Sequence, residues 1–178
     1  MIQFLRHFRD DEEASVAVET IIMLPALFWA YMGLFTIFDV YREHAVQQKA
    51  AYTISDVISR ETTPLNSTYL AGTREMLSFL TSQDSSKVAL RVTSVRYDAG
   101  DKKFKRDWSK TSGWVSNYSD SDVAALTAQL PTVPNNERVT IVETFTKYTP
   151  TFKTGLQDRT IHNFVFTRPR YAPRVLWD

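Results

Sequence analysis

The segment from Thr20 to Phe38, TIIMLPALFWAYMGLFTIF, most constrains the fold, because its 19 residues include no charged side chain. A helix of this length spans about 28 Å at 1.5 Å per residue, which is close to the hydrocarbon thickness of a bilayer. A helix buried in a soluble domain normally keeps a polar face, and this segment has none. We therefore expect a single transmembrane helix over residues 20–38, with a lipid bilayer around it.

Two other interpretations of this segment stay open. It could be the core helix of a soluble domain, although such helices usually show a polar face. It could also be a secretory signal that is removed after export. Against this, four acidic residues, Asp10 to Glu13, precede the segment and no A-x-A cleavage site follows it. A membrane anchor explains the sequence better than either alternative.

The orientation of the helix depends on the basic residues at its two ends. Arg6 and Arg9 precede the apolar segment, and Arg42 and Lys49 follow it, so the positive-inside rule gives a nearly balanced result. The short N-terminal tail and the long C-terminal part favour a cytoplasmic N-terminus. We therefore expect residues 1–14 to form a cytoplasmic leader and residues 61–178 to lie on the other side of the membrane.

Glu19 and Pro25 are unusual residues for a membrane helix. A carboxylate inside hydrocarbon is unfavourable by several kcal/mol unless it is paired or lies near the interface. Glu19 therefore either marks the membrane edge or awaits a cationic partner. Pro25 leaves the carbonyl of Ile21 without its helical hydrogen bond. It is either incidental, since membrane helices tolerate proline, or it lets the helix unwind when it leaves the bilayer or packs into a filament.

The composition excludes several classes of site. The chain has no Cys, which rules out disulfides, thiolate zinc sites and a Cys nucleophile. Its 21 basic and 20 acidic residues give a net charge of +1, so a nucleic-acid partner is not expected. The three histidines, His7, His44 and His162, lie far apart and lack partners at metal-ligand spacing. We therefore expect no catalytic residue, metal or cofactor, and no enzyme.

The rest of the chain predicts an α+β fold class, in which a long N-terminal helix packs on a small antiparallel sheet of about four strands. The helix should cover residues 15–60, because no Gly or Pro interrupts residues 39–59 and apolar residues recur there near helical spacing. A phase shift between Val92 and Val95 predicts a bulge. In domain 61–178 we expect helix 67–80, strands 88–97 and 104–108, a helix at 122–130 capped by Ser121 or Asp120, and strands 138–148 and 160–167.

Aromatic residues in this domain are candidates for a partner surface. Trp114 and Tyr118 lie in a polar loop, where aromatic side chains often form interface cores, although Trp114 could equally fill the domain's own core. Trp108 alternates with strand residues and is expected in the core. His162 is expected on a strand in a polar pocket, and Trp177 is either a docking residue or part of a frayed end.

The residues from Ala14 to Pro25, ASVAVETIIMLP, follow a short leader that carries basic residues and lead into the apolar segment. This order resembles the class III signal of prepilins, and in particular the TadE-like pseudopilins of tight-adherence pili. Residues 139–150, VTIVETFTKYTP, resemble the aromatic strand near the end of many TadE-like proteins, and the tail RPRYAPR at 168–174 is also similar.

The resemblance implies a pilin-like fold and a structural role in a type IVb-like pilus of the bacterial inner membrane. A prepilin peptidase would cut between Ala14 and Ser15, making Glu19 the fifth mature residue; prepilins usually have Gly where this chain has Ala14. The expected partners are that peptidase, other pilins or minor pseudopilins, and the inner-membrane assembly platform. Cleavage would give Ser15 a charged amine, which Glu19 could pair with in the same chain or in a neighbouring subunit.

Two rival functions remain open. The chain could be a single-pass envelope protein whose outer domain binds a partner without entering a pilus, with Glu19 as a boundary residue. It could also be a membrane-tethered hydrolase whose site carries no recognisable motif. An uncut N-terminus would favour the first rival, and turnover by a soluble fragment from Arg60 onward would favour the second.

Overall fold

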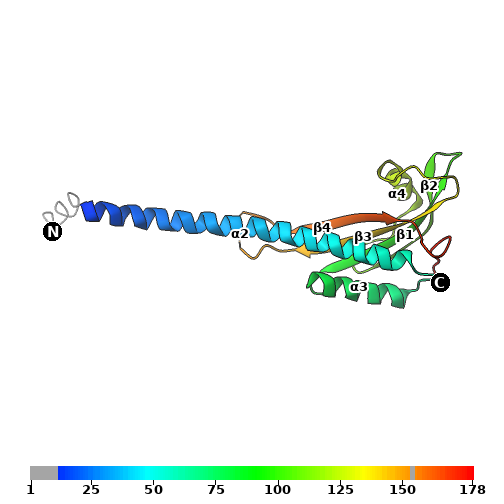
Figure 1. Ribbon diagram of the computed structural model, residues 1–178, viewed down its shortest axis with the longest axis horizontal. Helices are drawn as coiled ribbons and strands as arrows, with labels where there is room; N and C mark the ends of the chain where they lie inside the picture. Colours follow the sequence, from blue (N-terminus) through cyan, green and yellow to red (C-terminus); the bar gives the residue numbers. More distant parts are fainter. Residues whose placement is uncertain (1–11, 153–154) are drawn as a thin grey trace. The chain divides into compact units, whose positions relative to one another are not determined.

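The structure, a computed structural model, describes residues 12–152 and 155–178, with side chains from residue 16 onward. It consists of two compact units: Met1–Tyr41 with Pro150–Gln157, and Arg42–Thr149 with Asp158–Asp178. The helix α2 contributes to both units (Figure 1). In chain order the elements are α2 (Glu12–Ser59), α3 (Ser67–Thr81), β1 (Val88–Asp98), β2 (Lys103–Ser112), α4 (Asp120–Ala125), the 3-10 helix η1 (Leu126–Gln129), β3 (Arg138–Tyr148) and β4 (Arg159–Thr167).

The second unit is built around one antiparallel sheet with the strand order β2-β1-β3-β4. The pairing of β1 with β2 shifts at the predicted place, since Ser94 pairs with Trp108 and Val95 pairs with Arg106. The extra residue is Asp107 of β2, however, and not a residue of β1, which pairs with β3 without a break. A residue added to one strand reverses which face the following side chains occupy. Trp108 therefore joins the helix-covered face, while Phe104 joins the core on the opposite face.

One face of the sheet packs against helices. Ala50, Ile54 and Ile58 of α2 recur every four residues and are buried together with apolar residues of α3, β1 and β3. Gln47 precedes this series by one turn, and its buried amide oxygen accepts a hydrogen bond of 2.7 Å from Thr146 of β3. In Figure 1, α3 runs alongside the second half of α2. The helical spacing in residues 39–59 thus correctly predicted the face that packs on the sheet.

The opposite face is partly covered by α4 and η1, whose Val123 and Leu126 pack on Val95, Val139 and other residues of the sheet. The short helix begins earlier than predicted, at Asp120 rather than 122, and ends at Ala125 before it tightens into η1. Its N-cap is Ser119 rather than Ser121 or Asp120, because Ser119 and Asp122 form a reciprocal capping box.

The C-terminal residues are held in the fold. The backbone of Leu65 donates to the carbonyl of Leu176 and accepts from the amide of Asp178, each at 2.8 Å. Trp177 packs on Trp108 with ring centroids 5.6 Å apart. Trp108 in turn donates its indole N–H to the carbonyl of Val175 at 3.0 Å. Trp177 is therefore a packing residue and not part of a frayed end.

The structure confirms the coarse fold class, a long N-terminal helix and a four-stranded antiparallel sheet. Helix α3 and strands β3 and β4 agree with the predicted elements to within one residue at each end. Strand β2 is longer than the predicted 104–108, because its backbone pairing with β1 continues to Ser112 beyond the bulge.

We predict that Ile54→Ala lowers the free energy of unfolding by about 2–5 kcal/mol, because it leaves a cavity between α2 and the sheet. The measurement is chemical denaturation of the full chain in detergent micelles, followed by near-UV circular dichroism. Thr53→Ala is the matched control, since Thr53 is exposed on the same turn of α2. Equal effects of the two substitutions would contradict the packing described here.

Candidate functional site

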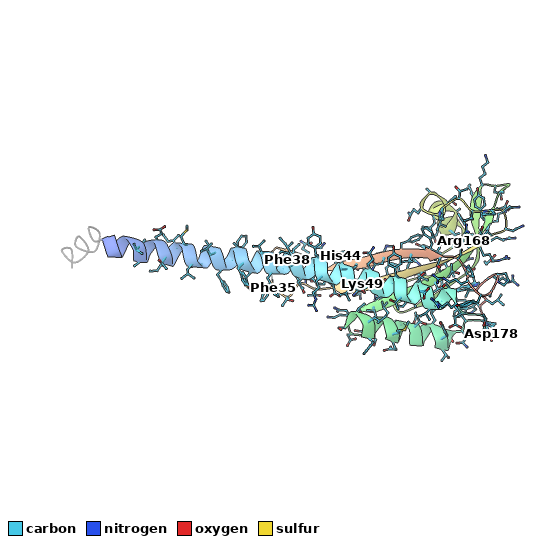
Figure 2. All side chains as sticks on the ribbon, viewed as in Figure 1. Phe35, Phe38, His44, Lys49, Arg168 and Asp178 are labelled. Carbon is cyan, nitrogen blue, oxygen red and sulfur yellow. The ribbon has the colours of Figure 1, made fainter. Side chains whose placement is uncertain are left out.

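The apolar part of α2 is the first candidate site. From Val16 to Tyr31 every side chain is exposed, and they stand out from both sides of the ribbon in Figure 2. Within the described part of the chain, α2 is the one helix that is long and apolar enough to cross a membrane. A stretch that is apolar all round is not stable in water and needs lipid or other helices against it.

The predicted assembly residues lie at the beginning of this stretch. Glu19 is exposed among apolar neighbours, and the helix continues through Pro25. The backbone of Ala14 and Ser15 forms part of the first turn of α2, while their side chains lie outside the described residues. Residues 1–11 of the predicted leader also lie outside them.

A charged cluster on the sheet face opposite α2 is the second candidate site. Its centre is Glu143 of β3, whose side chain is fully buried. Arg91, the residue paired with Glu143 on β1, binds both carboxylate oxygens through Nε at 2.7 Å and Nη2 at 2.8 Å. A two-point arginine–carboxylate contact of this kind is stronger and more specific than a single hydrogen bond.

Two further side chains bind the same carboxylate. Oε1 of Glu143 accepts a hydrogen bond of 2.9 Å from the hydroxyl of Tyr118 and lies 2.9 Å from Nε2 of His162. The guanidinium of Arg91 also lies 3.5 Å from the centre of the Tyr118 ring, within the range of a cation–π contact. The polar loop after β2 is thereby fixed to the two central strands and to β4.

The electrostatics follow from these contacts. Burial alone would raise the pKa of the Glu143 carboxyl, but hydrogen bonds from His162, Arg91 and Tyr118, with the Arg91 charge, outweigh burial and lower the pKa. Burial and the neighbouring Glu143 charge raise the pKa of Tyr118 to about 12, so its hydroxyl stays protonated and donates.

Aromatic side chains surround this cluster and reach the surface. Phe145 stacks on His162 with ring centroids 4.5 Å apart, and Trp114 lies edge-on to Phe145 at 6.1 Å. Lys147 places its ammonium 4.8 Å from the centre of the Trp114 ring. Trp114 is 42% exposed. We call Trp114, Phe145, Lys147 and His162 the aromatic patch.

The structure brings the two predicted partner-surface residues, Trp114 and Tyr118, to one place, but they have different roles. Tyr118 is half-buried and holds the carboxylate, while Trp114 belongs to the exposed aromatic patch. His162 lies on β4 with a polar contact as predicted, and its side chain is 44% exposed.

Sequence reasoning missed Glu143 and Arg91. The available signal was an acid and a base that each interrupt an apolar strand, in IVETF and ALRVT. A charge in the middle of a central strand requires an opposite charge beside it. The sequence does not show which residues contact Glu143, because this depends on how β1 and β4 pair with β3 and on the path of the loop after β2.

The cluster is suited to rigidity and recognition rather than to chemistry. Its one carboxylate is buried and already accepts hydrogen bonds from three side chains, so it is poorly placed to take a proton from a substrate. Among residues 16–152 and 155–178, no group of His, Asp and Glu side chains is arranged to hold a metal ion. The exposed aromatic patch is the part that can contact another molecule.

A hollow of about 590 Å³ lies beside α4. Basic side chains line it, but Lys105 pairs with Asp98 and Asp101, and Arg106 pairs with Asp120. Asp120, which the sequence suggested as a helix cap, thus serves as an ion-pair partner.

No family model matches the chain, and no curated protein or solved structure is similar enough to count as a match. The resemblance to TadE-like pseudopilins therefore stays a prediction.

We predict that Glu143→Gln lowers the free energy of unfolding by about 3 kcal/mol, because it removes the charge that pairs with the largely buried Arg91. Denaturation of the full chain in detergent measures the effect. Asp101→Asn removes one carboxylate from an exposed pair with Lys105 and should change the free energy of unfolding little. A neutral Glu143→Gln variant would contradict the assigned role.

We also predict that the pH dependence of stability differs between the native chain and Glu143→Gln. A carboxyl with a lowered pKa in the folded state stabilises the protein above its unfolded-state pKa of about 4.3. That contribution is lost as the pH falls through the folded-state pKa. The difference in free energy of unfolding between native and variant should therefore shrink as the pH is lowered from 7 to about 3. A difference that is independent of pH would contradict the lowered pKa.

Proposed function

We propose that this protein is a minor pseudopilin that acts in assembling or initiating a tight-adherence pilus. The observation that carries the proposal is the construction of α2. Its first part exposes apolar side chains on all sides, and its second part uses one apolar face to pack on an antiparallel sheet. A pilus subunit needs both surfaces, because its helix moves from lipid to the packed helices of a filament.

The exposed apolar stretch suits both environments. Lipid tails cover such a helix in the membrane, and neighbouring helices cover it in a filament core. A soluble single-domain protein would have no use for this surface, because the stretch from Val16 to Tyr31 is uncovered within the described residues. The proposed location is the bacterial inner membrane, with the N-terminus in the cytoplasm and the sheet domain on the other side.

Glu19 gives the proposal its chemical specificity. An exposed carboxylate next to an apolar stretch is unfavourable in lipid unless a cation neutralises it. A prepilin peptidase that cuts between Ala14 and Ser15 would create such a cation, the new amine of Ser15. The amine of a neighbouring subunit would serve equally well and would align the subunits. Pro25 removes one helical hydrogen bond and would let the helix adjust when it leaves the bilayer.

The aromatic patch is the proposed recognition surface of the outer domain. Trp114 supplies exposed apolar area, and the Glu143–Arg91 cluster beneath it fixes the loop that carries it. A surface that is rigid before binding loses less conformational entropy when a partner binds. Other pilins, minor pseudopilins and the assembly platform are the proposed partners.

The exposed aromatic patch also favours a second candidate function, a single-pass envelope protein that binds a partner outside any pilus. Such a protein needs the membrane helix and the patch but no role for Glu19 beyond marking the membrane edge. The two functions therefore differ in what they require of Glu19.

We predict that Glu19→Leu leaves the protein in the membrane but abolishes its co-purification with pilus partners, because the apolar surface is kept while the charge is lost. The measurement is cross-linking and affinity purification from cells that carry the pilus genes. Glu75→Leu, the same change at an exposed position on α3, is the matched control. Normal co-purification of Glu19→Leu would favour the second candidate.

A further inference from the structure

The apolar part of α2 changes character at Met32. Up to Tyr31 every described side chain is exposed, whereas Met32 and Gly33 are half-buried and Thr36 and Val40 are buried. These positions recur every three or four residues, so they lie on one face of the helix. One face of the last turns of the apolar stretch is therefore covered, while its other faces stay open.

The loop between β3 and β4, which is more than 100 residues away in sequence, contacts this part of the helix. The segment Pro150–Gln157, between β3 and β4, belongs to the same compact unit as residues 1–41. Phe152 packs edge-to-face on Phe35, with ring centroids 5.6 Å apart. Figure 2 labels Phe35 and Phe38 at this end of the apolar stretch. The loop thus places an aromatic side chain on the last turns of the apolar stretch.

The length of helix needed to cross a bilayer shows where the contact between Phe35 and Phe152 lies relative to the membrane. A bilayer core of about 30 Å needs about 20 helical residues. A span that begins at Val16 would end at Phe35, and one that begins after Glu19 would end at Asp39, the first charge beyond the apolar segment. The contact between Phe35 and Phe152 therefore lies at the membrane boundary or within about 6 Å of it.

We propose that the loop between β3 and β4 makes a second membrane contact, in which Phe152 inserts into the interfacial region of the bilayer beside α2. The proposal rests on the anchor that the proposed function also requires. The partner that Phe152 contacts in this proposal is the lipid surface. The sequence of the loop, PTFKTGLQ, contains two large apolar side chains and no acid, as expected of a segment that meets the membrane interface.

The depth of the loop is limited by its backbone. Irregular backbone exposed to lipid does not occur in the hydrocarbon core, because its N–H and C=O groups would lack partners. The backbone of Thr151 and Phe152 therefore lies among headgroups, with the Phe152 ring reaching inward. Two contacts separated along the chain would also restrain how the protein turns about the axis of α2, which a single span leaves free.

The chain has no Cys, so a single Cys introduced by mutagenesis takes a spin label at one chosen position. The loop position is Thr151, which is exposed beside Phe152. Ile22, in the exposed apolar stretch, is the reference for the membrane interior, and Asn117, exposed in the loop after β2, is the reference for water. Each labelled full-length chain is placed in phosphatidylcholine–phosphatidylglycerol vesicles. The rates at which the spin label collides with oxygen and with a water-soluble nickel chelate then report how deeply the label lies in the membrane.

We expect the label at Thr151 to be several-fold less accessible to the nickel chelate than the label at Asn117, and more accessible than the label at Ile22. Phe152→Ser should raise nickel access at Thr151 to the value at Asn117 while leaving Ile22 protected. Equal access at Thr151 and Asn117 with a protected Ile22 would overturn the loop proposal and leave the anchor intact. Free nickel access at Ile22 would overturn the loop proposal and the membrane-anchored function together.

Discussion

The exposed apolar surface of α2 is the constraint on which the account of this protein depends. Sixteen successive positions, Val16 to Tyr31, have no cover from the described part of the chain. Burying apolar side chains contributes about 25 cal/mol per Å², so a surface of this size strongly favours a nonaqueous neighbour. Lipid and a bundle of like helices are the two surroundings that satisfy it. The sheet domain carries the aromatic patch, the surface proposed to recognise partners.

In that domain, the buried carboxylate of Glu143 has the corresponding organising role. Its pair with Arg91 joins the two central strands, and its contacts with Tyr118 and His162 add the loop after β2 and the edge strand β4. Removing one partner of a buried pair leaves an uncompensated charge, so the arrangement is specific even where its net stabilisation is modest. The cluster thereby holds the aromatic patch in a defined geometry.

Much of the fold was predictable because it depends on local pattern. The spacing of Ala50, Ile54 and Ile58 identified the buried face of α2. The phase shift before Val95 gave the position of the bulge but the wrong strand, because it arises from apolar residues of β1 that enter the cores on both faces of the sheet. The cap of α4 was misassigned because several Ser and Asp residues compete within five positions. The Glu143 cluster was only partly predictable: the charges of Glu143 and Arg91 within apolar strands were a signal, but their pairing depends on strand register. Tyr118 reaches Glu143 from the loop after β2, which no local pattern indicates. The contact between Phe152 and Phe35 likewise joins residues that are far apart in sequence.

The most direct test of the proposed function is the N-terminal residue of the native protein. Intact mass and N-terminal peptide mapping should be done in cells with and without the prepilin peptidase. The account predicts a chain that begins at Ser15 only when the peptidase is present, which would place a charged amine four residues before Glu19. A chain that begins at Met1 in both cells would contradict the pseudopilin function and leave a single-pass membrane protein that is not processed for a pilus.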